Sequence, residues 1–183
     1  MQRVQYITLI RHGEAEHNVT QDPGQFDPPL TSYGIKQCLL LRSQQVNSDV
    51  QLILSSTSKR TLDTAIYAFP GKKVYASDLF IECNSGDLCN TPQDRGTLQG
   101  LYPQVDFDTY GVEKLATEAS LSDVTRRARR ILHMLQNIEY DKIVLVTHQH
   151  TICAILTALV LKRHLLDNCG DITVAIPRLG VTY

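Results

Sequence analysis

The 183-residue sequence lacks an excess of charge of either sign, and it lacks a hydrophobic run long enough to cross a membrane. Its 18 lysines and arginines nearly balance 19 aspartates and glutamates, so the formal net charge is -1. A chain with so little net charge has no global field that would draw it to nucleic acid or to a membrane surface. The N-terminus also lacks the pattern of a secretory signal peptide. We therefore expect a cytoplasmic protein with neither nucleic acid nor membranes among its partners.

The five cysteines follow no metal-binding or disulfide pattern. They are odd in number, irregularly spaced and include no CxxC motif, which leaves no basis for a zinc site. Cys83 and Cys89 share a loop-rich stretch, so a disulfide between these two is left open. Cys38 and Cys153 fall within expected helices, where a small buried thiol is the ordinary interpretation. We expect no bound metal and reducing surroundings.

Buried strands and amphipathic helices alternate along the chain, which is typical of an α/β fold. Short, dense apolar runs predict strands at residues 4–10, 52–57, 72–80, 142–148 and 172–176, with a further strand from Val181. Helical spacing predicts helices at residues 31–46, 58–69, 120–137 and 151–161, the first capped by Thr31 and the third by Ser120. Hydrophobic residues make up 43% of the chain, enough for a real core. We predict a single domain over residues 1–183, a three-layer sandwich with a largely parallel sheet and helices on both faces.

Two stretches are predicted as loops because glycine, proline and polar residues interrupt them. Residues 14–30 connect the first strand to the first helix, and residues 82–110 contain Gly86 and Pro92 among acidic and amide side chains. A loop-rich stretch of that length inside a compact domain is usually functional. We predict that residues 82–110 form a lid with short helices that selects the substrate, and that Arg95 helps to grip a polar substrate.

Three of the predicted strands end in arginine, histidine or hydroxyl residues. The first runs into Arg11, His12 and Gly13, the second leads through hydroxyl residues to Arg60, and the fourth ends at His148. In an open α/β sheet, ligands bind beyond the carboxyl ends of the strands, where the N-termini of the following helices add positive dipole ends. If these strands are parallel neighbours, two arginines and two histidines meet at one edge. Such a site suits a dianion.

A phosphate monoester is the dianion that this set of residues fits best. Arginines neutralise phosphoryl oxygens because their guanidinium groups are planar, permanently charged and bidentate. A histidine is mostly unprotonated at neutral pH, so it can act as a nucleophile and divide one difficult displacement into two easier ones through a phosphohistidine. A carboxylic acid must then protonate the departing alkoxide. The residues therefore indicate phosphate-ester chemistry without a metal or another cofactor.

Four segments of the chain carry motifs in a fixed order. They are RHGEAEHN at residues 11–18, DPPLTSYGIKQ at residues 27–37, SSTSKRTLDTA at residues 55–65 and VTHQHTI at residues 146–152. In this order they resemble the RHG signature, the LTxxGxxQ segment, the second arginine motif and the late histidine motif of the histidine phosphatase superfamily, in its phosphoglycerate-mutase-like branch. The resemblance runs from about residue 5 to about residue 155 and implies a phosphoglycerate-mutase-like α/β fold.

This resemblance implies a role for each matching residue. His12 would be the nucleophile that becomes phosphorylated. Glu82, within LFIECNSGD, would protonate the leaving group and then activate the attacking water. Arg11, Arg60 and His148 would bind and polarise the phosphoryl oxygens. The further candidates for contacts to phosphate or substrate are Gly13, Asn18, Gln149 and Arg95.

The sequence also departs from the family pattern. Thr57 and Ser58 stand where the second motif usually has Pro-Leu, which changes the loop before the arginine but keeps the arginine itself. Gln149 and His150 replace glycines after the late histidine, so their bulk either narrows the pocket or points away from it. The proton donor has two nearby alternatives, Asp78 and Asp87.

We expect a metal-independent phosphohydrolase that cleaves phosphate monoesters of small metabolites through a phosphohistidine. Three alternatives stay open: phosphoryl transfer of the phosphoglycerate mutase type, a phosphatase acting on phosphoproteins, and a non-catalytic module that binds a phosphorylated ligand. Mutases of this branch tend to be longer around the acid, and a binding module should have lost the nucleophile or the acid. The RRARR run at residues 126–130 is interpreted as a solvated helix face. The histidines given an ordinary structural interpretation are His17, His133, His150 and His164.

Overall fold

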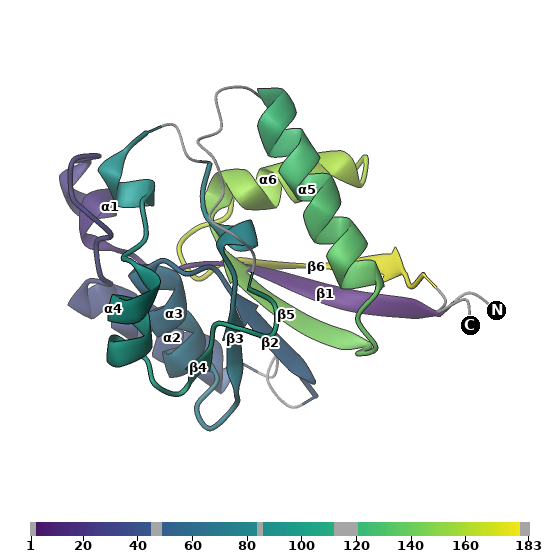
Figure 1. Cartoon of the computed structure of the whole chain (residues 1–183), viewed down its shortest axis with the longest axis horizontal. Helices are drawn as coiled ribbons and strands as arrows, with labels where there is room; N and C mark the ends of the chain where they lie inside the picture. The colour runs from purple at the N-terminus through teal and green to yellow at the C-terminus, as the bar shows by residue number, and fades with distance from the viewer. Residues whose placement is uncertain (1–2, 45–48, 84–85, 112–120, 180–183) are drawn as a thin grey trace.

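The computed structural model describes residues 3–44, 49–83, 86–111 and 121–179. Its centre is a six-stranded sheet with the strand order β4-β3-β2-β5-β1-β6 (Figure 1). The strands are β1 (Val4–Arg11), β2 (Leu52–Ser55), β3 (Val74–Ala76), β4 (Val105–Asp106), β5 (Lys142–Thr147) and β6 (Asp171–Pro177). Every neighbouring pair is parallel except β1 and β6, which pair antiparallel. The sheet is therefore largely parallel, as predicted.

Helices cover both faces of this sheet (Figure 1). One face carries α2 (Ser32–Ser43) and α3 (Lys59–Ala68), and the other carries α5 (Leu121–Gln136) and α6 (Gln149–Ala158). The shorter elements are α1 (Glu16–Thr20), α4 (Arg95–Leu101) and the 3₁₀ turns η2 (Asp78–Phe80) and η3 (Leu88–Asn90). None of the described helices is both long enough and apolar enough to cross a membrane. The predicted three-layer α/β sandwich is confirmed.

The sheet separates two hydrophobic cores because side chains alternate between its faces along each strand. On β2, Leu52 and Leu54 join the core beneath α5 and α6, whereas Ile53 joins the core beneath α2 and α3. On β5, Leu145 and Val146 divide in the same way. Central strands that are buried on both faces explain why these runs are dense in apolar residues and do not alternate with polar ones.

The loop after β1 is fixed by close contact with the start of α2. Thr31 caps α2 as predicted, since its Oγ1 atom accepts a hydrogen bond of 2.9 Å from the Gly34 N–H. The Oε1 atom of Gln37 accepts a bond of 2.8 Å from the Glu14 N–H. A Cβ atom on Gly34 would lie 2.0 Å from the Glu14 carbonyl oxygen, so only glycine fits there. This contact packs the start of α2 against the residues that follow His12.

Two local predictions are wrong, a missed helix and a strand end, and in both places side chains hydrogen-bond to the nearby backbone. α1 forms inside residues 14–30, where the sequence predicts only a loop. There the side-chain oxygen of Asn18 accepts a bond of 3.0 Å from the Ala15 N–H and caps a short helix. β3 is shorter than the strand predicted over residues 72–80, since the Ser77 hydroxyl accepts a hydrogen bond from the first turn of η2.

Residues 82–110 hold more regular structure than a loop with short helices. They contribute η3, α4 and also β4, an edge strand of 2 residues that is too short to be predicted from an apolar run. α6 begins at Gln149, earlier than predicted, because His148 follows β5 directly as the N-cap, and it ends before Val160 takes a left-handed φ of 58°. α2 ends at Ser43, earlier than the predicted end near Val46, because Gln44 is already extended. The Ser120 cap and the strand from Val181 lie outside the described residues.

Substituting Gly34 by alanine should destabilise the protein, because the new methyl group would collide with the Glu14 backbone. We expect a loss of about 3 kcal/mol in the free energy of unfolding, at the upper end for an overpacked site. Gly100→Ala is the matched control, since Gly100 lies in α4 with open space around it and alanine there should be neutral or slightly stabilising. Urea denaturation of the wild type and both variants measures the difference. Equal midpoints for the two variants would contradict the assigned contact.

Candidate active site

The carboxyl ends of β1, β2 and β5 meet at one edge of the sheet. The parallel register places Arg11 beside Thr147, and the His12 N–H donates to the Thr147 carbonyl oxygen at 3.1 Å. The ring centroids of His12 and His148 lie 5.2 Å apart, with 65° between the ring planes. Arg60, from the first turn of α3, reaches both rings. Two histidines and a buried arginine from three distant motifs are therefore in direct contact.

Arg60 is buried, with 1% of its surface exposed, and each of its side-chain nitrogens donates a hydrogen bond. The Nε atom donates to Nε2 of His12 at 3.3 Å, and Nη2 donates to Nδ1 of His148 at 3.2 Å. Nη1 donates to the Cys89 carbonyl oxygen at 2.6 Å, and Nη2 also donates to Oδ1 of Asn90 at 3.2 Å. The guanidinium group therefore connects the two histidines to the segment that carries η3.

Hydrogen bonds determine which nitrogen of His12 has the lone pair. Nδ1 lies 2.7 Å from the Gly13 carbonyl oxygen, which can only accept, so Nδ1 carries the proton. Nε2 keeps its lone pair, which is directed toward Arg60. Burial lowers the pKa of His12 well below its usual value, and the positive charge of Arg60 lowers it further. In the free protein His12 is a neutral imidazole whose unprotonated nitrogen faces a cation.

His148 is also a neutral ring, held in a defined tautomer. Its Nδ1 accepts from Arg60, so Nε2 carries the proton and donates to Oγ of Ser56 at 2.9 Å. Burial, followed by the charge of Arg60, lowers the pKa of His148 well below its usual value. Ser56 was not a candidate residue, and a serine in a hydroxyl-rich strand end offers no signal that would single it out.

Gly13 is packed too closely against its neighbours for any side chain. A Cβ atom there would lie 2.9 Å from the Gly34 carbonyl oxygen and 3.1 Å from Sγ of Cys38. The Gly13 N–H donates to Oγ1 of Thr64, on α3, at 3.0 Å. Gly13 thus ties the loop after His12 to both α2 and α3. Its predicted contact with phosphate stays a prediction, since its N–H already has a partner.

Arg11 is anchored by the loop that follows α6. Its Nη1 donates to the Leu166 carbonyl oxygen at 2.7 Å, whereas its buried Nε has no hydrogen-bond partner within the described residues. Gln149 holds the same loop, because its Oε1 accepts from the Leu166 N–H at 2.9 Å and its Nε2 donates to the His164 carbonyl oxygen at 3.0 Å. An unpaired buried N–H of a cation suits an anionic ligand. Gln149 positions the loop that holds Arg11, and its predicted contact with substrate stays a prediction.

Glu82 lies against the N-terminus of α6, where both carboxylate oxygens accept hydrogen bonds. Oε1 accepts from the N–H groups of Cys83 at 2.8 Å and Thr151 at 3.2 Å. Oε2 accepts from the His150 N–H at 3.2 Å and lies 3.3 Å from Nδ1 of the same residue. Burial by itself raises the pKa of Glu82, but the hydrogen bonds from His150 and Cys83 outweigh burial and hold the pKa below its usual value. Glu82 is therefore a firmly held carboxylate in the free protein.

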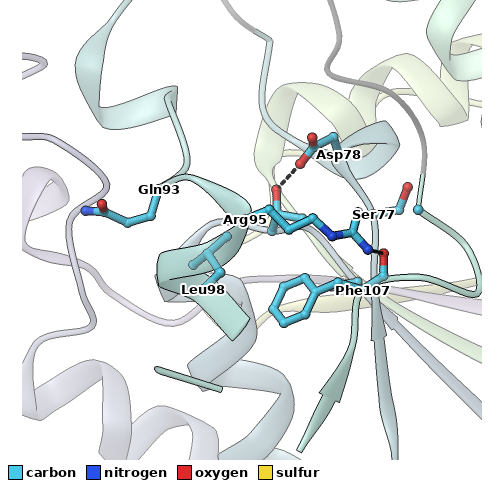
Figure 2. A pocket seen from close by; sticks show the side chains of 9 residues that line it. Ser77, Asp78, Gln93, Arg95, Leu98 and Phe107 are labelled. Atoms are coloured by element: carbon cyan, nitrogen blue, oxygen red, sulfur yellow. Dashed lines mark hydrogen bonds between the residues drawn. The ribbon is translucent and has the colours of Figure 1, made fainter. Parts of the chain in front are cut away.

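The two alternative acids have other partners. Asp78 accepts a hydrogen bond of 2.5 Å from the Thr57 hydroxyl, and it lines a pocket beside α4 (Figure 2). Asp87 is the N-cap residue of η3. Of the three carboxylates considered, Glu82 has bonds to the helix that directly follows His148, which favours Glu82 as the acid of this site.

Arg95 lies in the same pocket as Asp78. Figure 2 shows its side chain extended toward Phe107, whose carbonyl oxygen accepts a hydrogen bond from Nη2, and Asp108 accepts a second bond from that nitrogen. Leu98 and Phe107 supply the apolar part of the wall. Among the described residues that line this pocket, neither His12 nor His148 appears. The predicted grip of Arg95 on a substrate stays a prediction.

Asn18 and His17 form a polar flank beside His12. The ring centroids of His17 and His12 lie 5.9 Å apart, and Nδ2 of Asn18 lies 3.1 Å from Nε2 of His17. Asn168 donates to the His12 carbonyl oxygen at 3.1 Å and to Oδ1 of Asn18 at 3.4 Å. Burial, with the charges of the two arginines, lowers the pKa of His17 to about 4. Sequence reasoning missed His17, although its place in the first motif was a signal, and Asn168, which lies in no motif. The phosphate contact predicted for Asn18 stays a prediction.

The side chains at this edge are suited to an anion. Two arginines supply positive charge, two neutral histidines supply lone pairs, and one carboxylate can exchange a proton. In the described part of the chain, no group of three or more histidine, cysteine or acidic side chains is placed to hold a metal ion. The five cysteines all lie in the described part of the chain and none is in a disulfide, so the bond left open between Cys83 and Cys89 is not formed.

Comparisons with known proteins agree with this chemistry. The pattern of the family described as Histidine phosphatase superfamily (branch 1) matches residues 7–171. Phosphoserine phosphatase 1 from Hydrogenobacter thermophilus is 30% identical over 157 residues, which cover 80% of this chain and 71% of that protein. Probable phosphoglycerate mutase GpmB from Proteus mirabilis is 28% identical over 124 residues, which cover 67% of this chain but only 52% of that protein.

A solved structure extends the comparison to three dimensions. The crystal structure of phosphoserine phosphatase from Entamoeba histolytica in complex with 3-phosphoglyceric acid is similar, with a TM-score of 0.67 and 26% sequence identity. The likeness covers 92% of this chain and 89% of that one. The likeness therefore extends over most of the sandwich.

The neutral state of His12 should make stability depend on pH. Because its pKa is lowered by folding, the unfolded chain binds more protons as the pH falls below about 6.5, and stability is lost in that direction. Between about pH 7.5 and about pH 5.5 this single residue should account for a loss of about 1.4 kcal/mol. His12→Asn keeps a hydrogen-bond donor for the Gly13 carbonyl oxygen but has no side chain that titrates. The stability that this variant loses between the two pH values should therefore be smaller by that amount. Urea denaturation of both proteins at both pH values measures these losses. Equal losses in the wild type and in the variant would show that His12 is not held neutral.

Proposed function

We propose that this chain, which belongs to the histidine phosphatase superfamily, hydrolyses phosphate monoesters of small metabolites through a phosphohistidine at His12. One observation carries the proposal: the bond from Nδ1 to the Gly13 carbonyl leaves Nε2 with its lone pair, and that lone pair faces the guanidinium of Arg60. A phosphoryl group bound to this guanidinium would present its phosphorus atom to a nitrogen that is already in the nucleophilic tautomer.

Binding of the dianion would compensate the positive charges of one fully buried and one half-buried arginine. Arg60 is fully buried, and Arg11 has a buried Nε without a hydrogen-bond partner in the described residues. A phosphoryl oxygen placed between them would accept charge-assisted bonds that are strong in such surroundings. The added negative charge would also favour the protonated form of His148, which could then donate to the phosphoryl group.

The first step transfers the phosphoryl group to the enzyme. Nε2 of His12 attacks phosphorus, and the bond between phosphorus and the ester oxygen breaks with the electron pair on that oxygen. The oxygen receives a proton through Glu82 and leaves as the alcohol. The arginines stabilise the charge that spreads over the phosphoryl oxygens in this transition state.

The second step restores the free enzyme. A water molecule attacks the phosphorus of the phosphohistidine while Glu82 accepts its proton, since the group that acts as acid in one direction acts as base in the other. The bond between phosphorus and Nε2 breaks, and inorganic phosphate leaves. His12 regains its lone pair, and the bond from Nδ1 to Gly13 keeps the tautomer throughout.

The names of the relatives support a small phosphorylated acid as substrate. One relative is called a phosphoserine phosphatase, and a solved neighbour contains 3-phosphoglyceric acid. The pocket beside α4 offers a guanidinium and polar side chains together with three apolar ones, which suits a polar leaving group. We therefore place the alcohol part of the substrate toward residues 86–111, and we keep Arg95, Gln149 and Asn18 as proposed substrate contacts.

Phosphoryl transfer of the phosphoglycerate mutase type is the second candidate, because another relative has that name. A mutase returns the phosphoryl group to its substrate, whereas a hydrolase passes it to water. Both use the same histidine, so product analysis decides between them. A protein phosphatase and a non-catalytic binding module are weaker candidates, and the intact set of nucleophile, arginines and carboxylate argues against the module.

Phosphate release in the presence of EDTA tests the proposal directly. The wild type should release phosphate from para-nitrophenyl phosphate and from part of a panel of phosphoserine, phosphoglycerates, sugar phosphates and a phosphotyrosine peptide. His12→Ala should reduce the rate by at least about 10³-fold, because it removes the nucleophile. His133→Ala, at an exposed histidine of α5, is the control and should retain the wild-type rate. Interconversion of phosphoglycerates without release would favour the mutase, and a dependence of the wild-type rate on added metal would contradict the mechanism.

Glu82→Gln should separate good leaving groups from poor ones. For an alkyl phosphate we expect kcat/KM to fall by about 10²- to 10⁴-fold, the usual contribution of a general acid. For para-nitrophenyl phosphate the loss should be much smaller, since nitrophenolate leaves without a proton. Steady-state kinetics with both substrates measures the ratio. The same loss for both would remove Glu82 from the role of acid, and Asp78→Asn would then be the next variant to measure.

A further inference from the structure

His150 connects the buried carboxylate of Glu82 to solvent. Its backbone N–H and its ring Nδ1 both face Oε2 of Glu82, at 3.2 and 3.3 Å. The His150 side chain is 73% exposed, whereas the Glu82 side chain is 10% exposed. The second carboxylate oxygen, Oε1, is held by the N–H groups of Cys83 and Thr151. The imidazole ring therefore spans the boundary between the buried carboxylate and water.

The proposed reaction needs a proton that Glu82 does not hold by itself. The hydrogen bonds that fix its two oxygens favour the ionised form, and an ionised carboxylate cannot protonate an alkoxide. The pKa of His150 is shifted the other way. It is raised by the hydrogen bond to Glu82 and by the charge of Glu82, while burial and the charge of Arg11 oppose the rise. The imidazole is therefore the more basic group of this pair, and a proton shared between the two resides on it.

We propose that His150 is a positioning residue that orients Glu82 and stores the proton that Glu82 delivers. This inference rests on the proposed hydrolase function. As the ester bond breaks, the proton on Nδ1 of His150 moves to the carboxylate, and the carboxyl group passes a proton to the leaving oxygen. When water attacks the phosphohistidine, its proton returns to Glu82 and then to Nδ1. The pair carries one proton through the cycle, and no further donor is required.

The charges around His150 agree with this role. Glu82 faces the ring from the chain after η2, and Arg11 acts on it from the end of β1. Glu82 and Arg11 act on the ring in opposite directions, and a proton that moves between His150 and Glu82 leaves the total charge of the three groups unchanged. The backbone N–H of His150 holds Oε2 independently of the ring, so the orientation of the carboxylate partly survives loss of the side chain.

His150→Gly tests the inference because it removes the ring and keeps that backbone N–H. With an alkyl phosphate at about pH 7, we expect kcat/KM to fall by about tenfold, the effect of roughly one unit in the pKa of the donor. The basic limb of the pH profile should move to lower pH, since only Glu82 then holds the proton. Added imidazole should restore much of the rate because the site of the missing ring is open to solvent. With para-nitrophenyl phosphate the variant and the wild type should differ little.

Three outcomes would overturn the inference while the proposed function stands. They are a pH profile parallel to that of the wild type, equal losses with the two substrates, and no response to imidazole, each of which a purely structural role predicts. His133→Gln is the matched control for replacing an exposed histidine on a helix, and it should match the wild type in all three measurements. If the wild type neither releases phosphate nor forms a phosphoenzyme, the hydrolase function is itself wrong and the inference falls with it.

Discussion

Arg60 carries a full positive charge into the interior of the sandwich, and the properties of its neighbours follow from how that charge is held. Its hydrogen bonds run to the two histidine rings and to the chain around η3. Burial and this charge together keep His12 and His148 unprotonated. The groups that hydrogen-bond to Arg60 are neutral, and Asp27 and Glu82 stabilise its charge through space, so an anionic ligand would add compensation by direct contact. One side chain thus favours an anionic ligand and keeps both neighbouring rings neutral.

Residues that need not touch a substrate hold this arrangement in place. Asp27 accepts from the N–H groups of Lys59 at 3.0 Å and Gln93 at 3.1 Å, which joins the start of α3 to the segment before α4. Gln149 fixes the loop that anchors Arg11. These side chains convert three separate motifs into one rigid edge, as a site that relies on orientation requires.

Much of this edge could be predicted from the sequence, because the strands are dense apolar runs and their ends carry unusual polar residues. The meeting of His12, Arg60 and His148 follows from parallel topology alone, since the carboxyl ends of neighbouring parallel strands lie together. The LTxxGxxQ segment needs glycine at Gly34 because any side chain there would collide with the backbone of Glu14. Strand topology and close backbone contacts depend on the course of the backbone, so periodicity and motif spacing in the sequence can predict them.

Side-chain direction could not be predicted in the same way. Gln149 points to the loop after α6, and Asn18 caps a short helix within a stretch predicted as loop, since each orientation depends on contacts from distant parts of the chain. His150 appeared only as bulk in place of glycine, and its contact with Glu82 exists only because α6 begins directly after β5. β4 was missed because two residues give no periodic signal.

Two of the hydrogen bonds from Arg60 end on Cys89 and Asn90, within the segment that the sequence predicts as the lid. The part of the chain that lines the pocket beside α4 is therefore also part of the support for the central cation. A chimera that takes residues 86–111 from another member of the family would acquire new pocket walls and, in the same exchange, a new environment for the guanidinium. The basicity of His12 would change with it. If residues 86–111 contact the substrate as proposed, selectivity and the basicity of His12 change together, so laboratory evolution toward a new substrate must select for both.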